Sequence, residues 1–101
     1  MIFSILHPVL CPSSLTTLPG WEGVQTLLMD CPVCRQQFSI LVRQDGLPDA
    51  TRAIWTLSQP PGNSSWAAVS LAPSIIQHPV THNRTACPAH FSVANGQVVL
   101  H

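Results

Sequence analysis

Two short phrases in this chain place metal-binding side chains three positions apart. The first, at residues 31–34, reads C-P-V-C, and the second, at residues 87–90, reads C-P-A-H. Each spacing lets a tight turn direct two side chains at one point, and two such turns supply the four tetrahedral ligands that Zn²⁺ prefers. Thiolate and imidazole ligands also suit zinc better than magnesium or calcium. The sequence therefore predicts one zinc ion held by Cys31, Cys34, Cys87 and His90.

Two histidines are candidates for the fourth ligand. His90 has the matching spacing, and His82 is its substitute, whereas Cys11 has no partner at ligand spacing and is expected to be a bystander thiol. Four protein ligands make a closed site that stabilises a fold. A catalytic three-cysteine site would need the H-x-E partner of zinc deaminases, which is missing because the only glutamate is Glu22. We therefore expect a structural zinc.

Disulfide bonds are the main alternative for the cysteines. The triplets at residues 63–65 and 83–85 are glycosylation acceptors of a secreted chain, although such triplets arise easily by chance. Residues 1–6 are apolar, but they have no charged leader and are interrupted by His7 and Pro8. No apolar run approaches the ~20 residues of a membrane span. We expect a cytoplasmic protein with reduced cysteines and no membrane association.

Composition limits the kind of partner. The chain has 101 residues, of which 46% are hydrophobic and 8% charged, and its net charge is zero. This size and composition fit one globular domain. The four basic residues are scattered, so the basic stripe of a nucleic-acid-binding protein is absent. The expected partner is another protein.

The elements that must position these residues are short strands. Alternating apolar residues predict strands at 24–29 and 38–43, which place the first ligand pair at the tip of a hairpin. The Asn-Gly pair at residues 95–96 predicts a tight turn between strands at 91–94 and 97–100. The second ligand pair therefore also leads into a hairpin.

The remaining segments complete the predicted fold. Asp49 could cap a short helix over residues 50–57, but residues 53–58 also alternate as a strand, and we favour the strand because prolines follow at once. Residues 66–71 predict a further strand that stops at Pro73. Residues 1–23 are expected to be an irregular lead-in, although their opening apolar run could form a weak edge strand. Residues 24–101 are expected to form one zinc-stabilised domain. The expected fold is mostly β, a small antiparallel zinc-ribbon-like domain of hairpins with little or no helix.

From about residue 28 to residue 100 the chain resembles a known family. Residues 66–75 read W-A-A-V-S-L-A-P-S-I, and residues 87–99 combine C-P-A-H-F-S-V with N-G-Q-V-V. This order is similar to that of small bacterial and phage zinc-binding proteins of a domain-of-unknown-function family. Its pattern is a CPCGC-like knuckle, then S-L-x-P-S-I, C-x-S-H-F-x-I and a terminal G-x-V strand. This chain differs in having two knuckle cysteines rather than three, and Ala89 in place of the serine in C-x-S-H.

The resemblance implies a second function. Some family members lie in bacterial ubiquitin-like conjugation operons, where they are thought to act as peptidases on the ubiquitin-like protein. For this chain the resemblance makes Ser74 the nucleophile and His90 the base, provided that zinc does not use His90. The acid that would orient the base is one of four, and no spacing selects among them: Asp30, Asp45, Asp49 and Glu22.

Two functions therefore compete. The favoured one is a zinc-stabilised β domain, phage- or prophage-encoded, that acts as a protein-interaction module. The alternative is a small Ser/His hydrolase, a peptidase acting on a ubiquitin-like protein.

Overall fold

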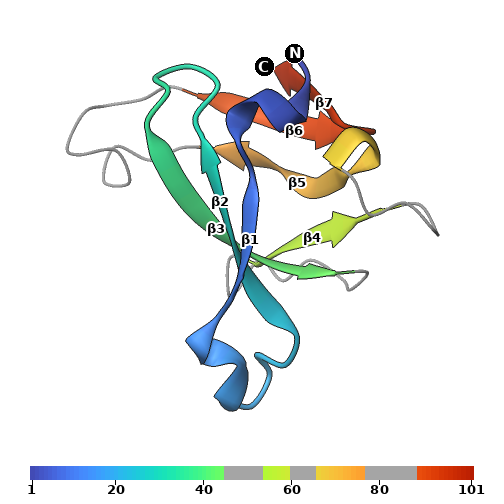
Figure 1. The fold of residues 1–101 in the computed structure, drawn as a ribbon. Coiled ribbons are helices and arrows are strands. Elements are labelled where there is room, and N and C mark those ends of the chain that lie inside the picture. The colour runs from blue at the N-terminus through green and yellow to red at the C-terminus, as the bar shows by residue number, and fades with distance from the viewer. Residues whose placement is uncertain (45–53, 60–65, 77–88) are drawn as a thin grey trace.

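A computed structural model describes residues 1–44, 54–59, 66–76 and 89–101 of the chain. The described residues form one seven-stranded sheet whose strands follow one another in chain order (Figure 1). The strands are β1 (Val9–Pro12), β2 (Val24–Asp30), β3 (Gln37–Gln44), β4 (Ile54–Ser58), β5 (Ser70–Ile76), β6 (His90–Ala94) and β7 (Gln97–Leu100). Three 3-10 turns accompany them, η1 (Phe3–Leu6), η2 (Ser14–Thr17) and η3 (Trp66–Ala68). The predicted mostly β fold with little helix is confirmed.

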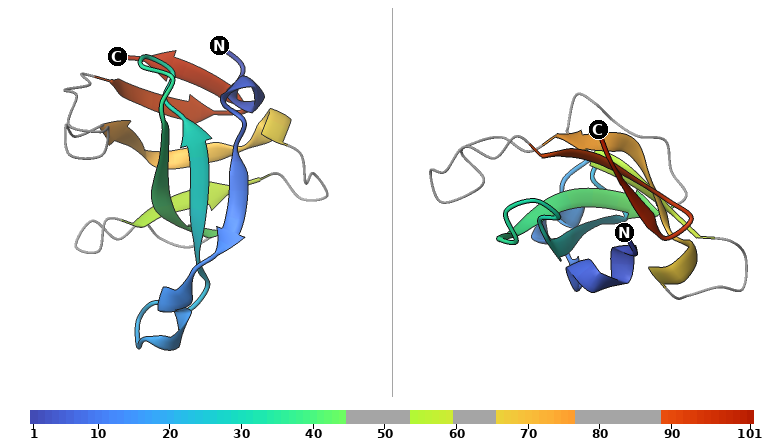
Figure 2. Two further views of the ribbon diagram at one scale, coloured as in Figure 1. Left: turned by 60° about the vertical axis from the view of Figure 1, so that its left-hand side comes forward. Right: turned by 90° about the horizontal axis from the view of Figure 1, so that it is seen from above.

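The sheet curls over so that β1–β3 face β5–β7, with β4 at the corner between them (Figure 2). Alternating residues of both halves fill the space between, including Leu27 and Val42 from the first half and Val93 from the second. Phe38 and Phe91 meet edge to face across this core, with ring centroids 6.4 Å apart, a favoured aromatic geometry. One core therefore holds the two halves together.

Several predicted strands are confirmed by the pairing. The segments expected at 24–29 and 38–43 are β2 and β3, and the segment expected at 53–58 contains β4. The Asn-Gly hairpin is confirmed as β6 and β7, with φ of 50° at Asn95 and 74° at Gly96. Neighbouring strands are antiparallel except β3 and β4, which run parallel. No local signal encodes the direction of a pair that is not a hairpin, so the sequence did not indicate this exception.

The strand expected at residues 66–71 was placed too early. Trp66–Ala68 form a 3-10 turn, and β5 begins at Ser70 and continues through Pro73 to Ile76. The peptide bond between Ala72 and Pro73 is cis. Proline is tolerated inside a strand where the ladder is irregular, since no N–H is needed there. Pro73 therefore lies within β5 rather than ending it.

Residues 1–23 also differ from the expected irregular lead-in. β1 pairs with β2 along its whole length, from Val9 opposite Leu28 to Pro12 opposite Gln25. Phe3 and Leu6 are fully buried, and Phe3 packs edge to face on Trp66 at 5.7 Å. The prolines that suggested irregularity are compatible with this arrangement because β1 is an edge strand. In the part of the chain that the structure describes, no helix is long and apolar enough to cross a membrane.

Candidate active site

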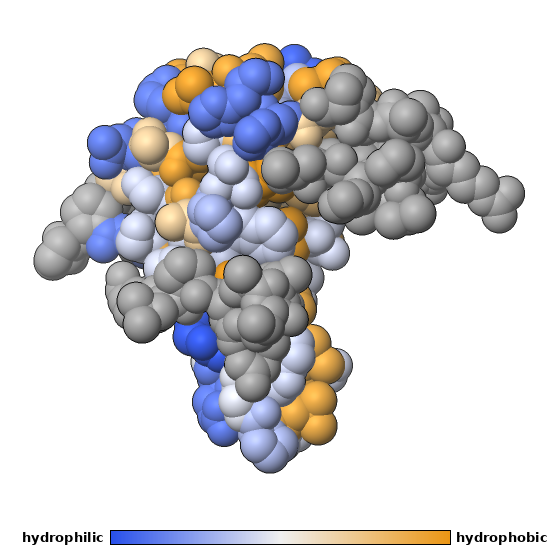
Figure 3. Space-filling model, turned by 180° about the vertical axis from the view of Figure 1, so that it is seen from behind, coloured by the Kyte–Doolittle hydropathy of each residue, from blue (hydrophilic) through white to orange (hydrophobic). Residues whose placement is uncertain are grey.

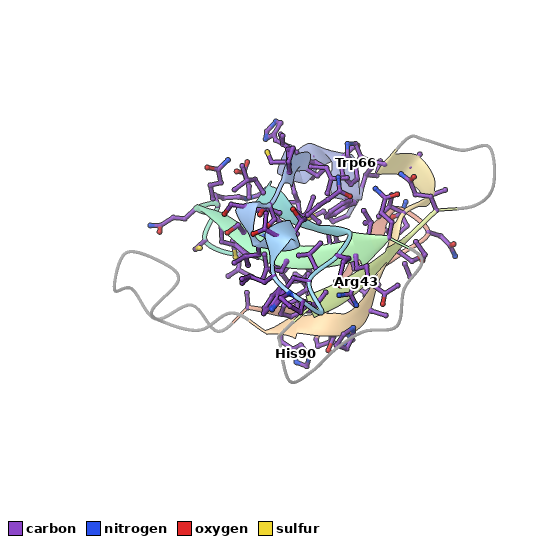
Figure 4. All side chains as sticks on the ribbon, turned by 90° about the horizontal axis from the view of Figure 1, so that it is seen from below. Arg43, Trp66 and His90 are labelled. Carbon is purple, nitrogen blue, oxygen red and sulfur yellow. The ribbon has the colours of Figure 1, made fainter. Side chains whose placement is uncertain are left out.

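The chemistry-bearing residues lie on the outer face of β5–β7, which we define as the face turned away from the core. On β6, Phe91 and Val93 point into the core, so the alternating residues His90 and Ser92 point outward. Figure 4 shows His90 on the outside of the sheet, on the side of the molecule away from Trp66. Alternation along one strand therefore separates the site from the core.

Ser74 reaches this face from an irregular part of β5. Between two paired positions β5 advances four residues, from Leu71 to Ile75, while β6 moves back only two, from Val93 to Phe91. Ser74 lies in the extra length, directly after Pro73. Irregularities of this kind re-aim a side chain, and they are common beside active sites.

Ser74 and His90 meet across β5 and β6. Oγ of Ser74 lies 3.0 Å from Nε2 of His90, which is hydrogen-bond distance. Both residues are half-buried. A serine hydroxyl bonded to an imidazole nitrogen is the arrangement in which histidine takes the serine proton.

The backbone of Ser74 is held by a tryptophan. The indole Nε1–H of Trp55, on β4, donates to the carbonyl oxygen of Ser74 at 3.3 Å. Trp55 also packs against the core cluster. Trp55 thus both packs on the core and holds the backbone of the candidate nucleophile.

None of the four proposed acids is placed beside His90 by the described residues. Asp30 bonds Nδ1 of His7 at 2.9 Å. Glu22 lies just before β2, where its backbone carbonyl accepts from Nε of Arg43 at 3.2 Å, and Asp45 and Asp49 lie outside the described residues. Within the described ranges, no hydrogen bond joins His90 to a carboxylate. Among the described residues, His101 is a titratable neighbour of His90, with ring centroids 4.7 Å apart.

His101 and its neighbour Ser92 are residues that sequence reasoning missed. Oγ of Ser92 is 2.6 Å from Nε2 of His101. The signal was present in the Asn-Gly turn: pairing Ala94 with Gln97 and extending the register places His101 opposite His90. Ser92, two positions after His90, must then share its face.

The expected zinc site is described only in part. Cys31 and Cys34 lie in the turn from β2 to β3, where the N–H of Val33 donates to Sγ of Cys31 at 3.4 Å. Cys31 shares the buried cluster with Ala89, two residues after Cys87. Cys87 and His82 themselves lie outside the described residues, among which no group of three potential ligands occurs. The zinc site therefore stays a prediction.

His90 was predicted to be the fourth zinc ligand, and the geometry gives its Nε2 another partner. That nitrogen faces Ser74 at hydrogen-bond distance, and an imidazole nitrogen cannot bind a metal and accept a proton at once. Cys11, expected to be a bystander, lies within β1 as a reduced thiol.

A serine hydroxyl at hydrogen-bond distance from a histidine nitrogen is an arrangement found in serine hydrolases. The sequence model of the family described as "Bacterial ubiquitination-like system serine protease (BubE)" matches residues 8–101. The chain belongs to this family. No curated protein and no solved structure matches it.

The family match agrees with the expected link to bacterial ubiquitin-like conjugation systems, and its description fits the hydrolase alternative better than a structural zinc module. It says nothing of zinc or of phage origin, which stay predictions.

Proposed function

We propose that this protein is a serine peptidase of a bacterial ubiquitination-like system, with Ser74 as nucleophile and His90 as general base. The observation that carries the proposal is the 3.0 Å separation between Ser74 Oγ and His90 Nε2. The family description independently names a serine protease. The two lines of support are different in kind, since one is local geometry and the other is similarity over most of the chain.

The proposed reaction follows from this pair. Ser74 Oγ attacks the carbonyl carbon of the substrate while its proton passes to His90 Nε2. The resulting tetrahedral intermediate collapses as His90 returns that proton to the leaving amine, which frees the first product and leaves an ester on Ser74. Water, deprotonated by His90, then hydrolyses the ester and restores the serine hydroxyl.

The proposed substrate is a ubiquitin-like protein of the same system. The outer face around Ser74 is the solvent side of the sheet, so an extended segment of another protein can lie across it. Figure 3 shows that the described residues on the back of the molecule carry apolar side chains among polar ones, with an apolar area along one edge of the lower projection. A mixed surface of this kind suits a transient protein partner.

Cleavage of a ubiquitin-like protein carrying a C-terminal extension tests the proposal. We expect the purified protein to shorten this substrate by one discrete mass, and Ser74→Ala and His90→Gln to lower the rate by at least about 10³-fold, as in other serine hydrolases. Ser39→Ala, which alters an exposed serine on β3, should leave the rate unchanged. Equal cleavage by Ser74→Ala would exclude this nucleophile.

A structural zinc is proposed alongside this activity, with Cys31, Cys34, Cys87 and His82 as ligands. The N–H···S bond from Val33 supports it, because donors to sulfur favour the thiolate that zinc requires. Such an ion would cross-link two segments separated by 52 residues (35–86). His90 is left out of the set because it is needed as a base.

Metal analysis of the purified protein tests this second proposal. We expect about one zinc per chain, with Cys31→Ser losing both the metal and the cooperative thermal transition. His90→Gln should keep its zinc, whereas loss of zinc from that variant would return His90 to the ligand set. Metal-free protein that unfolds cooperatively would contradict the zinc site.

A further inference from the structure

His90 lacks a described carboxylate partner, yet a base must hold its imidazole in one orientation. An outward-facing histidine can turn about both of its side-chain torsions. In serine hydrolases a third group normally fixes the ring from the side opposite the nucleophile. The question is therefore what holds His90 on the outer face of β5–β7.

His101 directly follows β7 and lies opposite His90 in the β6–β7 hairpin. Its backbone N–H donates to the carbonyl oxygen of His90 at 2.8 Å, which continues the β6–β7 ladder by one step. The two rings lie 4.7 Å apart between centroids and are tilted by 40°. This spacing is in the range of stacked aromatic rings, so the ring of His101 occupies one side of His90.

The ring of His101 is itself anchored. Oγ of Ser92 lies 2.6 Å from Nε2 of His101. Ser92 stands on β6 two positions beyond His90, on the same outer face. A side chain of β6 thus holds the His101 ring against its neighbour on the same strand, and His101 is fixed at two points, its backbone and its imidazole.

We propose that His101, anchored by Ser92, is a positioning residue that holds the His90 imidazole toward Ser74 by packing its own ring against it. This inference rests on the proposed serine hydrolase function. The hydroxyl and the second imidazole act only through His90. They restrict its ring, so they affect the bond-forming step rather than the binding of a reactant.

Reaction with a fluorophosphonate measures this role without a known substrate. The serine oxygen displaces fluoride from the probe's phosphorus and becomes phosphonylated, and the kinetics separate the maximal rate constant, kinact, from the binding constant, KI. We expect His101→Ala and Ser92→Ala to lower kinact by roughly tenfold to a hundredfold, the scale of small misplacements, and to leave KI unchanged. Ser92→Thr, which keeps the hydroxyl, should recover most of the rate. His101→Phe keeps a ring but loses the bond to Ser92, so it should react about as slowly as Ser92→Ala.

Two controls make the comparison specific. His7→Ala removes an exposed histidine that is also bonded to a side chain, Asp30, and Ser39→Ala removes an exposed strand serine. Neither should change kinact. Thermal melts identify any variant that has lost its fold. If His101→Ala is unfolded, the comparison of Ser92→Ala with Ser92→Thr tests the proposal.

The outcomes separate this inference from the function on which it rests. If wild-type protein is not labelled at Ser74, the proposed function fails and the positioning role fails with it. If wild type is labelled and folded His101→Ala and Ser92→Ala react as fast, only the positioning role is overturned. A rise in KI with unchanged kinact would likewise contradict it, because it would mean that these residues bind the reactant.

Discussion

At the scale of single residues, the proposed function depends on which group the His90 imidazole contacts. Its spacing from Cys87 suggested a metal ligand, because C-x-x-H matches C-x-x-C. The fold directs its Nε2 to Ser74, a residue sixteen positions away, and its role as a metal ligand stays a prediction. The spacing of residues in the sequence indicates which side chains one turn can bring together. It does not indicate which strand lies next to that turn in the sheet. Only the family resemblance indicated the pairing with Ser74.

Trp55 gives a prediction at the same scale. Trp55→Phe removes the indole N–H that bonds the Ser74 carbonyl, so we expect slower fluorophosphonate labelling and a loss of about 1 kcal/mol in the free energy of unfolding. Trp66→Phe is the matched control, because Trp66 packs on Phe3 rather than on the nucleophile. It should lose stability and keep the labelling rate. Equal slowing in both variants would show that Trp55 acts through packing alone.

At the scale of elements, sequence reasoning succeeded where one local signal defines the element. The β6–β7 hairpin follows from Asn-Gly and its alternating flanks, and β2 and β3 follow from alternation alone. It failed for β5, since Pro73 was taken as an end of the strand. Pro73 instead occupies the irregular stretch that presents Ser74. Pro73, which led to the wrong end for this strand, is thus adjacent to the candidate nucleophile.

Gly96 provides the test of the hairpin that carries His90 and His101. Its φ is +74°, and a Cβ there would collide with the carbonyl oxygen of Ala67. Gly96→Ala should therefore cost more than the ~1–2 kcal/mol of a left-handed alanine alone, measured by urea unfolding. Gly23→Ala is the matched control, because Gly23 has nearly the same φ, +76°, and open space around it. Equal losses would contradict the close contact between the hairpin and η3.

At the scale of the whole molecule, the sheet's two halves and the N-terminal segment form one unit. Buried residues from η1, from β2–β3 and from β5–β7 belong to a single cluster, and the parallel pairing of β3 with β4 joins the halves. The sequence indicated the alternating faces and missed how they close on one another. Closure depends on contacts between residues far apart in the chain, such as Phe3 with Trp66.

The N-terminal segment can be tested for its share in this core. Phe3 is fully buried, so Phe3→Ala should lower the free energy of unfolding by about 3–5 kcal/mol through the lost transfer energy and the cavity. Ile5→Ala changes a neighbour that is 47% exposed and should stay within about 0.5 kcal/mol. A small loss for Phe3→Ala would mean that residues before β1 do not belong to the core in solution.

The central claim is that Ser74 is a nucleophile activated by His90, and the mass of the protein after reaction with a fluorophosphonate tests it most directly. We predict one adduct per chain, located by trypsin digestion to the peptide of residues 53–84 and by fragmentation to Ser74. The adduct should be lost in Ser74→Ala and strongly slowed in His90→Gln. An unmodified wild-type protein, or an adduct that persists in Ser74→Ala, would contradict the account.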